Sequence, residues 1–381
     1  MKRICILVIF LILSFAATGC FFAAQPVEVA EAIATPTPAP TPRPTPTPAP
    51  TPPPVPPPEP PPGMGVNTLT GEYIDIGVTG RRPVAVVIDN IRRALPQTGI
   101  AQADILYEVL AEGGTTRLVA IFKEFDAEKI GPVRSARSYF VDIVLDHDAI
   151  FVHHGGSPAS YNDIQNLNIN NLDGITEGQV FWRDQARLNQ GRRDHSSFTN
   201  TERIWHRVHQ RGMRYAINSD HPHAFAFYPG PSEPRQSEPA TEIEIPFVPT
   251  YSSWFTFDEE TGLYTMSTTH GPHIDEDTGD ALTFSNIIVQ NTQIRQIGDY
   301  ANRRDVVMVG QGGGYLFTNG RVAPITWVRD DRTSSTRWYN EQGLQLNLNR
   351  GRTYIAITQN APIVHEPSVE YDEDEDENDE V

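Results

Sequence analysis

A proline-rich segment between residues 35 and 62 limits where this 381-residue chain can build a folded core. Seventeen of its 28 residues are proline, mostly in Thr-Pro and Pro-Pro pairs. Proline has no amide hydrogen to donate, and its ring excludes it from helix interiors and central strands. Such a run favours polyproline II and acts as a semi-rigid spacer, with a reach on the order of 80–90 Å when fully extended. We therefore expect the globular part to begin after this spacer, at about residue 67, and residues 21–66 to form a disordered tether.

The residues before the spacer have the pattern of an exported, lipid-anchored protein. Two basic residues precede an apolar stretch from Ile4 to Phe15, and small residues lead to Cys20. This order is typical of a secretory signal. Gly19-Cys20 resembles the lipobox of bacterial lipoproteins, with Ala17 standing where leucine is usual. The resemblance implies cleavage of residues 1–19 and a lipid on Cys20, which makes the lipid membrane a predicted partner. An uncleaved membrane helix is the alternative, since the apolar run is close to the lower limit for a span.

Composition narrows the chemistry of the mature chain. Removal of the signal leaves Cys20 as the only cysteine, which excludes a disulfide, a cysteine metal site and a cysteine nucleophile. The formal net charge is −18, and half of it lies in residues 370–380. We expect this acidic tail, 366–381, to be disordered. The remainder is only mildly acidic, so charge gives no case for a nucleic-acid partner.

Strand and helix patterns interleave in residues 67–230. Short β-branched runs predict buried strands, whereas apolar residues three and four apart predict helices. Pro132 suits the first turn of one such helix. We expect strands at 83–89, 105–110, 117–122 and 149–153, and helices at 132–145 and 200–212.

The part that follows a polar linker at 229–239 has mostly strand patterns. Residues 258–262 separate two alternating runs, and Asn319-Gly320 is the strongest two-residue hairpin signal. Gly310–Gly314 lacks the lysine and the helix of a phosphate-binding loop, and we interpret it as a glycine-rich turn. The predicted class is α+β: an α/β layered N-terminal domain at 67–230, then a smaller β-rich C-terminal domain at 241–365.

Several separated motifs agree in order and spacing with a known family. They are Tyr107–Arg117, Gly131–Arg137, Phe181–Asp184, His195 with Phe198-Thr199, Gly314–Gly320 and Ile325–Trp327. Together they resemble the YerB-type lipoproteins, a bacterial family defined by a domain of unknown function with N-terminal and C-terminal parts. The resemblance covers nearly all of 80–358 and implies a lipoprotein with a two-part head, but no activity. Asp194 stands where that pattern has proline.

Arg134 and Arg137 form the first candidate site. Three residues apart on a helix, they would share one face beside its positive N-terminus. Two guanidinium groups there can clamp a carboxylate or a phosphate. The alternative is that they pair with internal acids such as Glu108 or Glu112.

Two further stretches carry candidate ligand-binding residues. His153-His154-Gly155 ends a predicted strand and leads into a helix, a place where open α/β sheets often bind ligands. Adjacent strand residues point to opposite faces, so a metal shared by the two rings is disfavoured. Trp182 can stack on a sugar ring while Arg183 binds its acidic substituents, and His195 follows in the same polar stretch. An ion-pair network on a surface loop explains the same residues with fewer assumptions.

These observations lead to one hypothesis and two alternatives. We expect a binding or scaffold module at the extracytoplasmic face of a bacterial membrane, recognising an anionic or sugar-containing ligand on a cell-wall glycan or an envelope protein. A cell-wall hydrolase is the main alternative, with Asp89, Glu108 or Glu112 as an acid and His153 or His195 as a base. The other is a protein-binding surface formed by Trp254, Trp327 and Trp338. No complete catalytic motif is found, and we expect neither a cofactor nor a metal.

Overall fold

The computed structural model describes residues 59–222 and 225–366. The signal, Cys20, almost all of the proline-rich spacer and the acidic tail lie outside the described residues, so what was inferred for them stays a prediction. Among the helices that are described, none is long and apolar enough to cross a membrane.

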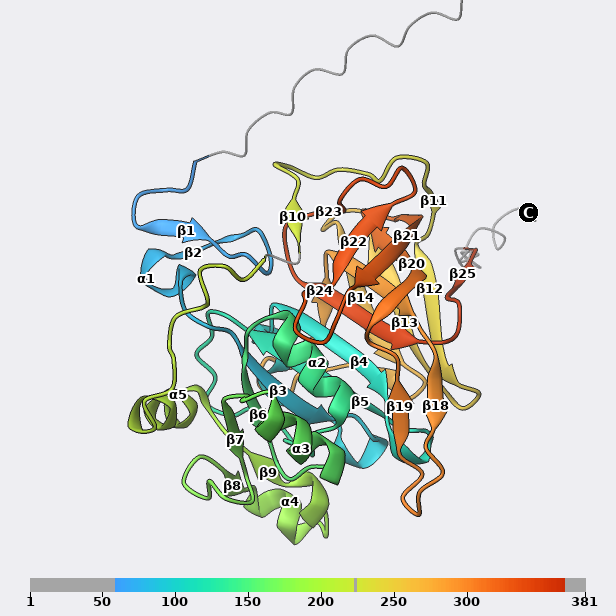
Figure 1. The fold of residues 1–381 in the computed structure, drawn as a ribbon. Helices are drawn as coiled ribbons and strands as arrows, with labels where there is room; N and C mark the ends of the chain where they lie inside the picture. The colour runs from blue at the N-terminus through green and yellow to red at the C-terminus, as the bar shows by residue number, and fades with distance from the viewer. Residues whose placement is uncertain (1–58, 223–224, 367–381) are drawn as a thin grey trace, which may run out of the picture. The chain divides into compact units, whose positions relative to one another are not determined.

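The N-terminal part is built around three strands in which every residue is buried, as expected of a sheet covered on both faces. β5 pairs antiparallel with β4 and with β3, and the sheet continues in parallel from β3 to β6 and β7. Two helices, α2 and α3, pack against each other in front of this sheet (Figure 1). The elements are β3 (Val84–Asp89), β4 (Ile105–Leu110), β5 (Thr116–Phe122), β6 (Ile150–His153), β7 (Asn171–Asp173), α2 (Ser138–Asp146) and α3 (Pro158–Asn166).

The same sheet continues into the C-terminal part. β24 pairs in parallel with β4, with Thr353 opposite Ile105. The described residues thereby form one 11-stranded sheet in the order β11-β21-β20-β17-β24-β4-β5-β3-β6-β7, with β22 paired to β21. Its C-terminal strands are β11 (Glu238–Pro239), β17 (Asn286–Asn291), β20 (Gly310–Thr318), β21 (Arg321–Arg329), β22 (Arg337–Asn340) and β24 (Thr353–Thr358).

A second, antiparallel sheet packs on the first through aromatic side chains. The ring of Phe255 lies 4.8 Å from that of Tyr354, and Phe284 lies 5.6 Å from Tyr354. The strand order is β15-β14-β13-β12-β25, with β16 on β14. Its strands are β12 (Glu242–Val248), β13 (Tyr251–Asp258), β14 (Leu263–Thr268), β15 (Gly271–Pro272), β16 (Thr283–Phe284) and β25 (Ile363–His365).

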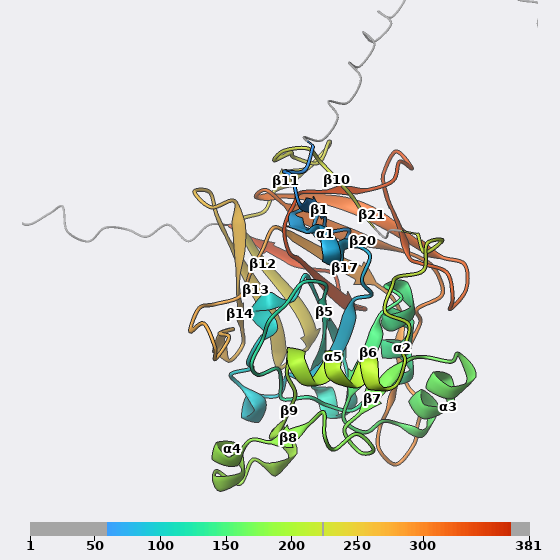
Figure 2. The same ribbon diagram turned by 90° about the vertical axis from the view of Figure 1, so that its left-hand side faces the viewer.

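Short elements complete the described chain. α5 (Thr201–Gln210) is capped by Asn200, whose side chain accepts from Arg203 N. The helix ends beside β7, where Arg211 donates to Asn171 O (Figure 2). The paired strands are β1 (Met64–Val66) with β2 (Tyr73–Asp75), β8 (Trp182–Arg183) with β9 (Ser197–Phe198), β10 (Ala226–Phe227) with β23 (Asn347–Leu348), and β18 (Ile294–Gln296) with β19 (Arg304–Val306). The remaining helices are α1 (Ile76–Thr79), α4 (Gln185–Asn189) and the 3-10 turns η1 (Arg92–Ala94), η2 (Ile100–Gln102), η3 (Glu112–Gly114) and η4 (Arg193–His195).

This arrangement confirms the predicted fold class, a mixed α/β N-terminal region followed by an antiparallel β-rich region. The division into domains at 67–230 and 241–365 stays a prediction, because one sheet takes strands from both parts. Trp327 and Trp338 are buried in the core. Trp254 stacks on His365 with ring centroids 5.1 Å apart, so the three tryptophans do not form one exposed surface.

The helix predicted over 132–145 is shorter than expected, because only its second part forms α2. The preceding residues pair with distant backbone: Val133 N, for example, donates to Ser197 O at 2.7 Å. These bonds use groups that a helix would need. Arg137 is the residue before the helix, in an extended conformation, and Arg134 lies outside it. The prediction that the two arginines share a helical face is therefore wrong.

The glycine-rich segment Gly310–Gly314 is also not a turn, because it forms the first part of β20. Its glycines make room for neighbouring groups. A Cβ at Gly312 would lie 2.6 Å from Trp327 Nε1, and one at Gly314 would lie 2.2 Å from Val289 O. A buried tryptophan and a close neighbouring strand, rather than a ligand, account for these glycines.

His273 makes stability depend on pH. It is 2% exposed, its Nε2 bonds Gln97 Oε1, and its Nδ1 has no partner among the described residues. Burial lowers its pKa from 6.5 to about 4. Below pH 6.5 the unfolded chain therefore takes up a proton that the folded chain refuses, so this ring's contribution to stability is lost as the pH falls toward 4.

We expect the His273→Gln variant to lose less stability on acidification than the parent. The chain from residue 20 with Cys20→Ser, hereafter the soluble chain, serves as the parent. Between pH 7 and pH 5 its free energy of unfolding should fall by about 2 kcal/mol more than that of the variant. Urea titrations at the two pH values measure this difference, and equal falls would show that the ring is accessible to protons in the folded state.

Candidate functional site

Three parallel strands end at one edge of the large sheet and bring polar residues there. Asp89 is the last residue of β3, His153 ends β6 with His154 directly after it, and Asp173 ends β7. Ligands of open α/β sheets bind in this position, outside the carboxyl ends of the strands. The β8–β9 pair lies beyond the ends of β6 and β7 in Figure 1, and it supplies the other side chains of the site.

Asp89 and His195 form a buried hydrogen-bonded pair at this edge. Asp89 is 1% exposed, and its Oδ2 lies 2.7 Å from His195 Nδ1. A carboxylate accepts only, so Nδ1 carries the proton and donates. This fixes the ring and leaves Nε2 as the nitrogen that can exchange a proton with another molecule. No hydrogen bond joins Nε2 to the described residues. The pair therefore has the arrangement of an oriented base.

Arg134 adds a positive charge to the same carboxylate. Its Nε lies 3.2 Å from Asp89 Oδ2, and its Nη1 donates to Asp194 O at 3.1 Å. Its side chain is 29% exposed. The Nε–Oδ2 contact is close but is not an aligned hydrogen bond, so Nε has no hydrogen-bond partner among the described residues. The charge of Asp89 is thus the main interaction that holds Arg134 here, and some of its N–H groups make no hydrogen bond to the described residues.

His154 links the strand edge to the β8–β9 pair. Its Nδ1 lies 2.7 Å from Ser197 Oγ, and its Nε2 lies 3.2 Å from Arg183 Nη2. A guanidinium only donates, so Nε2 must accept and Nδ1 must carry the proton. Burial lowers the pKa of His154, and the charge of Arg183 lowers it further. The neutral ring thus donates to Ser197 and cannot activate that hydroxyl as a nucleophile.

We call the set formed by Asp89, Arg134, His154, Arg183 and His195 the strand-edge cluster. Arg134 and His195 contact the Asp89 carboxylate. Arg183 contacts His154, whose backbone N–H donates to Arg134 O at 3.0 Å.

The chain resembles known proteins over both of its folded parts. Two family models match, the DUF3048 N-terminal domain over residues 69–214 and the DUF3048 C-terminal domain over residues 243–355, each described as a protein of unknown function. "Putative lipoprotein YerB" of Bacillus subtilis strain 168 is 33% identical over 263 residues, 68% of this chain and 76% of that protein. This chain belongs to the DUF3048 family. The crystal structure of the YerB protein from Bacillus subtilis has a TM-score of 0.69 and 30% identity, covering 79% of this chain and 99% of that one.

These matches confirm the resemblance seen in the motifs, and they give the DUF3048 chain a relative named as a lipoprotein. Neither family description names a ligand or a reaction. We therefore infer the role of the strand-edge cluster from its own chemistry.

Arg137, the second arginine of the predicted clamp, is engaged elsewhere. Its Nε and Nη2 both bind the carboxylate of Glu112, with Nη2 2.8 Å from Oε2. Arg117 lies 3.4 Å from the same carboxylate. This is the alternative in which an arginine pairs with an internal acid, and it separates Arg137 from the carboxylate that Arg134 uses.

We expect Arg137→Ala to affect stability rather than binding. Loss of hydrogen bonds between charged, half-buried groups should lower the free energy of unfolding by about 1–3 kcal/mol. Affinity for anions at the strand-edge cluster should stay within about twofold, since Arg137 contacts none of its members. Urea unfolding and calorimetric titration on one preparation measure both quantities. An unchanged stability with lost binding would place Arg137 in the site after all.

His153 and Trp182 also have local partners. His153 is fully buried; its Nδ1 lies 2.8 Å from Gly155 O and its Nε2 lies 3.0 Å from Asn171 Nδ2. Burial lowers its pKa. Trp182 is half-buried, with the Arg203 guanidinium 4.9 Å from its ring centroid. His153 positions its neighbour His154, and one face of Trp182 is already occupied.

Two arginines of the 183–195 stretch bind the backbone of a neighbouring loop. Arg187 and Arg192 donate to backbone carbonyls between residues 93 and 96, at 2.5–2.8 Å. Their role is to hold the loop that carries His195. The pairing of Asp89 with His195 is the feature that sequence reasoning missed, and the polar end of the 83–89 strand pattern was its signal.

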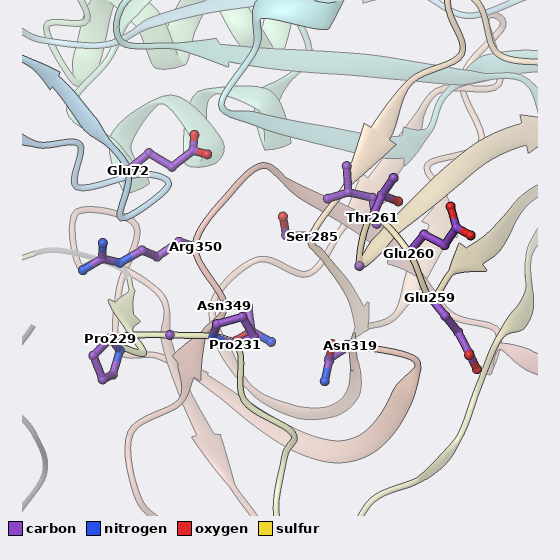
Figure 3. A pocket seen from close by; sticks show the side chains of 13 residues that line it. Glu72, Pro229, Pro231, Glu259, Glu260, Thr261, Ser285, Asn319, Asn349 and Arg350 are labelled. Atoms are coloured by element: carbon purple, nitrogen blue, oxygen red, sulfur yellow. The ribbon is translucent and has the colours of Figure 1, made fainter.

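Two cavities lie away from the cluster and are less suited to ligand chemistry. One of about 580 Å³ is lined by Glu72, Arg350, residues 229–231 and the hairpin tip at 259–263, and its acids outnumber its one basic residue (Figure 3). Another of about 540 Å³ lies at the amino ends of β3, β6 and β7, opposite the cluster. There Arg82 already binds four oxygen acceptors, among them Asp148 O and Asn170 Oδ1.

Proposed function

We propose that this protein is a lipid-anchored binding module on the extracytoplasmic face of a bacterial membrane, and that its head recognises an anionic or sugar-containing ligand. The observation that carries the proposal is the strand-edge cluster. There Arg134 shares the Asp89 carboxylate with His195, and Arg183 contacts His154, at the strand ends where α/β folds bind ligands. The signal and lipobox pattern supports the anchor, as does the name of the Bacillus relative.

The charges of the cluster favour an anion. Arg134, Arg183 and the neighbouring Arg193 bring three guanidinium groups near three carboxylates, those of Asp89, Asp173 and Asp194. Burial lowers the pKa of Arg183, and the like charges of Arg193 and Arg134 lower it further, against the opposing charge of Asp194. Cations that repel one another gain from an added anion. Polymers of the cell envelope that carry acidic groups are the natural partners for such a site.

A ligand screen by thermal unfolding of the soluble chain tests this function. The panel comprises inorganic phosphate, acetate, anionic glycans and peptidoglycan fragments. A ligand present at about a hundredfold over its Kd should raise the free energy of unfolding of the soluble chain by about 2.7 kcal/mol. We expect Arg134→Ala/Arg183→Ala to abolish the shift and Arg137→Ala to keep it. A shift that survives the double substitution would place the ligand elsewhere.

The Asp89–His195 pair also supports a second candidate, a cell-wall hydrolase in which His195 Nε2 removes a proton from water. The buried carboxylate orients the ring as a general base requires. We expect hydrolysis of peptidoglycan or of acidic wall polymers to be lost in Asp89→Asn, which keeps the shape but not the charge. Mass spectrometry of the polymer after incubation detects cleavage. Intact polymer that binds the protein would decide for a binding module.

A further inference from the structure

We propose that the strand-edge cluster takes a phosphoryl group carrying two negative charges, and that His195 binds it in its doubly protonated form. This inference rests on the proposed anion-binding function and adds the ligand class and the residue that decides it. It follows from donors at the cluster without a hydrogen-bond partner and from the charges around them.

The first observation is the unused nitrogen of His195. The side chain is 10% exposed, and its Nδ1 is engaged by Asp89. Nε2 makes no hydrogen bond within the described chain, and it is not among the buried polar atoms, so it is open to solvent or to a ligand. An acceptor oxygen of a ligand would fill this position when Nε2 carries a proton. An imidazolium with Asp89 on one nitrogen and an anion on the other has both of its donors satisfied.

The second observation is the incomplete bonding of the two arginines. Arg134 Nε makes no aligned hydrogen bond despite its 3.2 Å contact with Asp89 Oδ2. The hydrogen bonds of Arg183 run from Nη1 to Arg193 O and from Nη2 to His154 Nε2. Neither Arg134 Nη2 nor Arg183 Nε has a hydrogen bond to any described residue. These groups and His195 Nε2 supply charged donors for more than two ligand oxygens.

The third observation is the charge around His195. The charged or titratable groups around the cluster are Asp89, Arg134, His154, Asp173, Arg183, Arg193 and Asp194. Arg187 also reaches the backbone carbonyl of His195. Arg134, Arg183 and Arg193 bring three guanidinium groups to the cluster, and Asp89, Asp173 and Asp194 bring three carboxylates, whereas Arg187 pairs with Glu276. A protonated His195 adds an unpaired positive charge beside the guanidinium groups, and an anion with two charges gains more from it than a carboxylate does.

A phosphoryl group fits these features. It has three acceptor oxygens and about two negative charges near neutral pH, and arginine binds it through several parallel hydrogen bonds. Free phosphate and a phosphomonoester on a larger molecule share this chemistry. Glycerol phosphate represents the second source, and a tighter complex with it than with inorganic phosphate would assign the natural ligand to the esters.

Calorimetric titration of the soluble chain tests the inference. Sulfate keeps two charges between pH 6 and pH 8, so any proton taken up with it comes to the protein. We expect inorganic phosphate and sulfate to bind and acetate to bind at least tenfold more weakly. The affinity for sulfate should fall as the pH rises, by a factor that approaches ten per pH unit. Repeating the titration in buffers of different ionisation enthalpy measures proton uptake, which should reach up to one proton per bound sulfate.

Variants show which residue takes up the proton, and they distinguish failure of this inference from failure of the proposed anion-binding function. His195→Gln should weaken sulfate binding and remove its pH dependence, whereas His206→Gln on α5 should change neither. If sulfate binding depends on Arg134 but not on pH, His195 does not bind the anion in its doubly protonated form, whereas the anion-binding function is retained. If acetate binds as tightly as sulfate, the proposed preference for a doubly charged anion is wrong. Absence of binding by phosphate, sulfate and acetate alike would overturn the anion-binding function itself.

Discussion

Replacing Glu108 by alanine is expected to lower the free energy of unfolding of the soluble chain by about 3–5 kcal/mol. Glu108 is completely buried. Its Oε1 accepts from Asn90 Nδ2 at 2.9 Å and Thr116 Oγ1 at 2.5 Å. Its Oε2 accepts from Ser253 Oγ at 2.8 Å and Tyr354 OH at 2.6 Å. Alanine leaves these donors buried without their acceptor and creates a cavity.

Glu108 also joins the two parts of the family domain. Its partners on β5 and after β3 belong to the N-terminal match, and those on β13 and β24 belong to the C-terminal match. Burial raises the pKa of this carboxyl, while the hydrogen bonds oppose the shift. Its loss should therefore weaken both parts together rather than release one of them.

Urea unfolding of Glu108→Ala, followed by tryptophan fluorescence and by circular dichroism, checks this prediction. The midpoints of unfolding from both probes should move to lower urea concentration by the same amount, because the large sheet runs through both parts. Glu124→Ala, at an exposed position without a hydrogen bond in the described chain, should stay within about 0.5 kcal/mol of the parent. A Glu108→Ala variant as stable as this control would contradict the central role of the network.

Asp146→Ala is expected to lower the free energy of unfolding of the soluble chain by about 3–5 kcal/mol. Asp146 lies on α2 and accepts from Thr336 N at 2.5 Å and from Thr336 Oγ1 at 2.8 Å. The fully buried Arg329 places its Nη1 3.9 Å from Asp146 Oδ2, and that nitrogen has no other partner among the described residues. Without Asp146, the arginine becomes an uncompensated buried cation.

A second substitution separates the charge from the hydrogen bonds. Asp146→Ala/Arg329→Met removes both charges, and we expect it to recover at least 1 kcal/mol of the loss, because an apolar side chain tolerates the buried position. Asp330→Ala, which breaks an exposed ion pair with Arg337, should cost less than about 1 kcal/mol. Chemical denaturation measures all three. A double variant less stable than Asp146→Ala would show that Arg329 is satisfied by its backbone acceptors alone.

Local patterns predicted much of the fold because they were unambiguous. The strand runs at 83–89 and 105–110 became β3 and β4, and Asn319-Gly320 became the hairpin turn between β20 and β21. Both turn residues have positive φ, 51° and 69°, as such a turn requires. These features depend on residues close together in the sequence.

Features that depend on distant residues were not predictable. Thr353 pairs with Ile105 across most of the chain, and no local signal records that partner. The segment before α2 was misread for the same reason, since its amides bond backbone far away in the sequence. At the site, the strand-end rule located His154, but the contact between Asp89 and His195 spans 106 residues.

A crystal structure of the soluble chain grown with inorganic phosphate tests the central claim most directly. We expect a phosphate at the carboxyl ends of β3 and β6, contacted by Arg134, Arg183 and His195 Nε2, with Asp89 still bound to His195 Nδ1. A phosphate bound at another place, with Arg134 and Arg183 contacting only the protein, would contradict it.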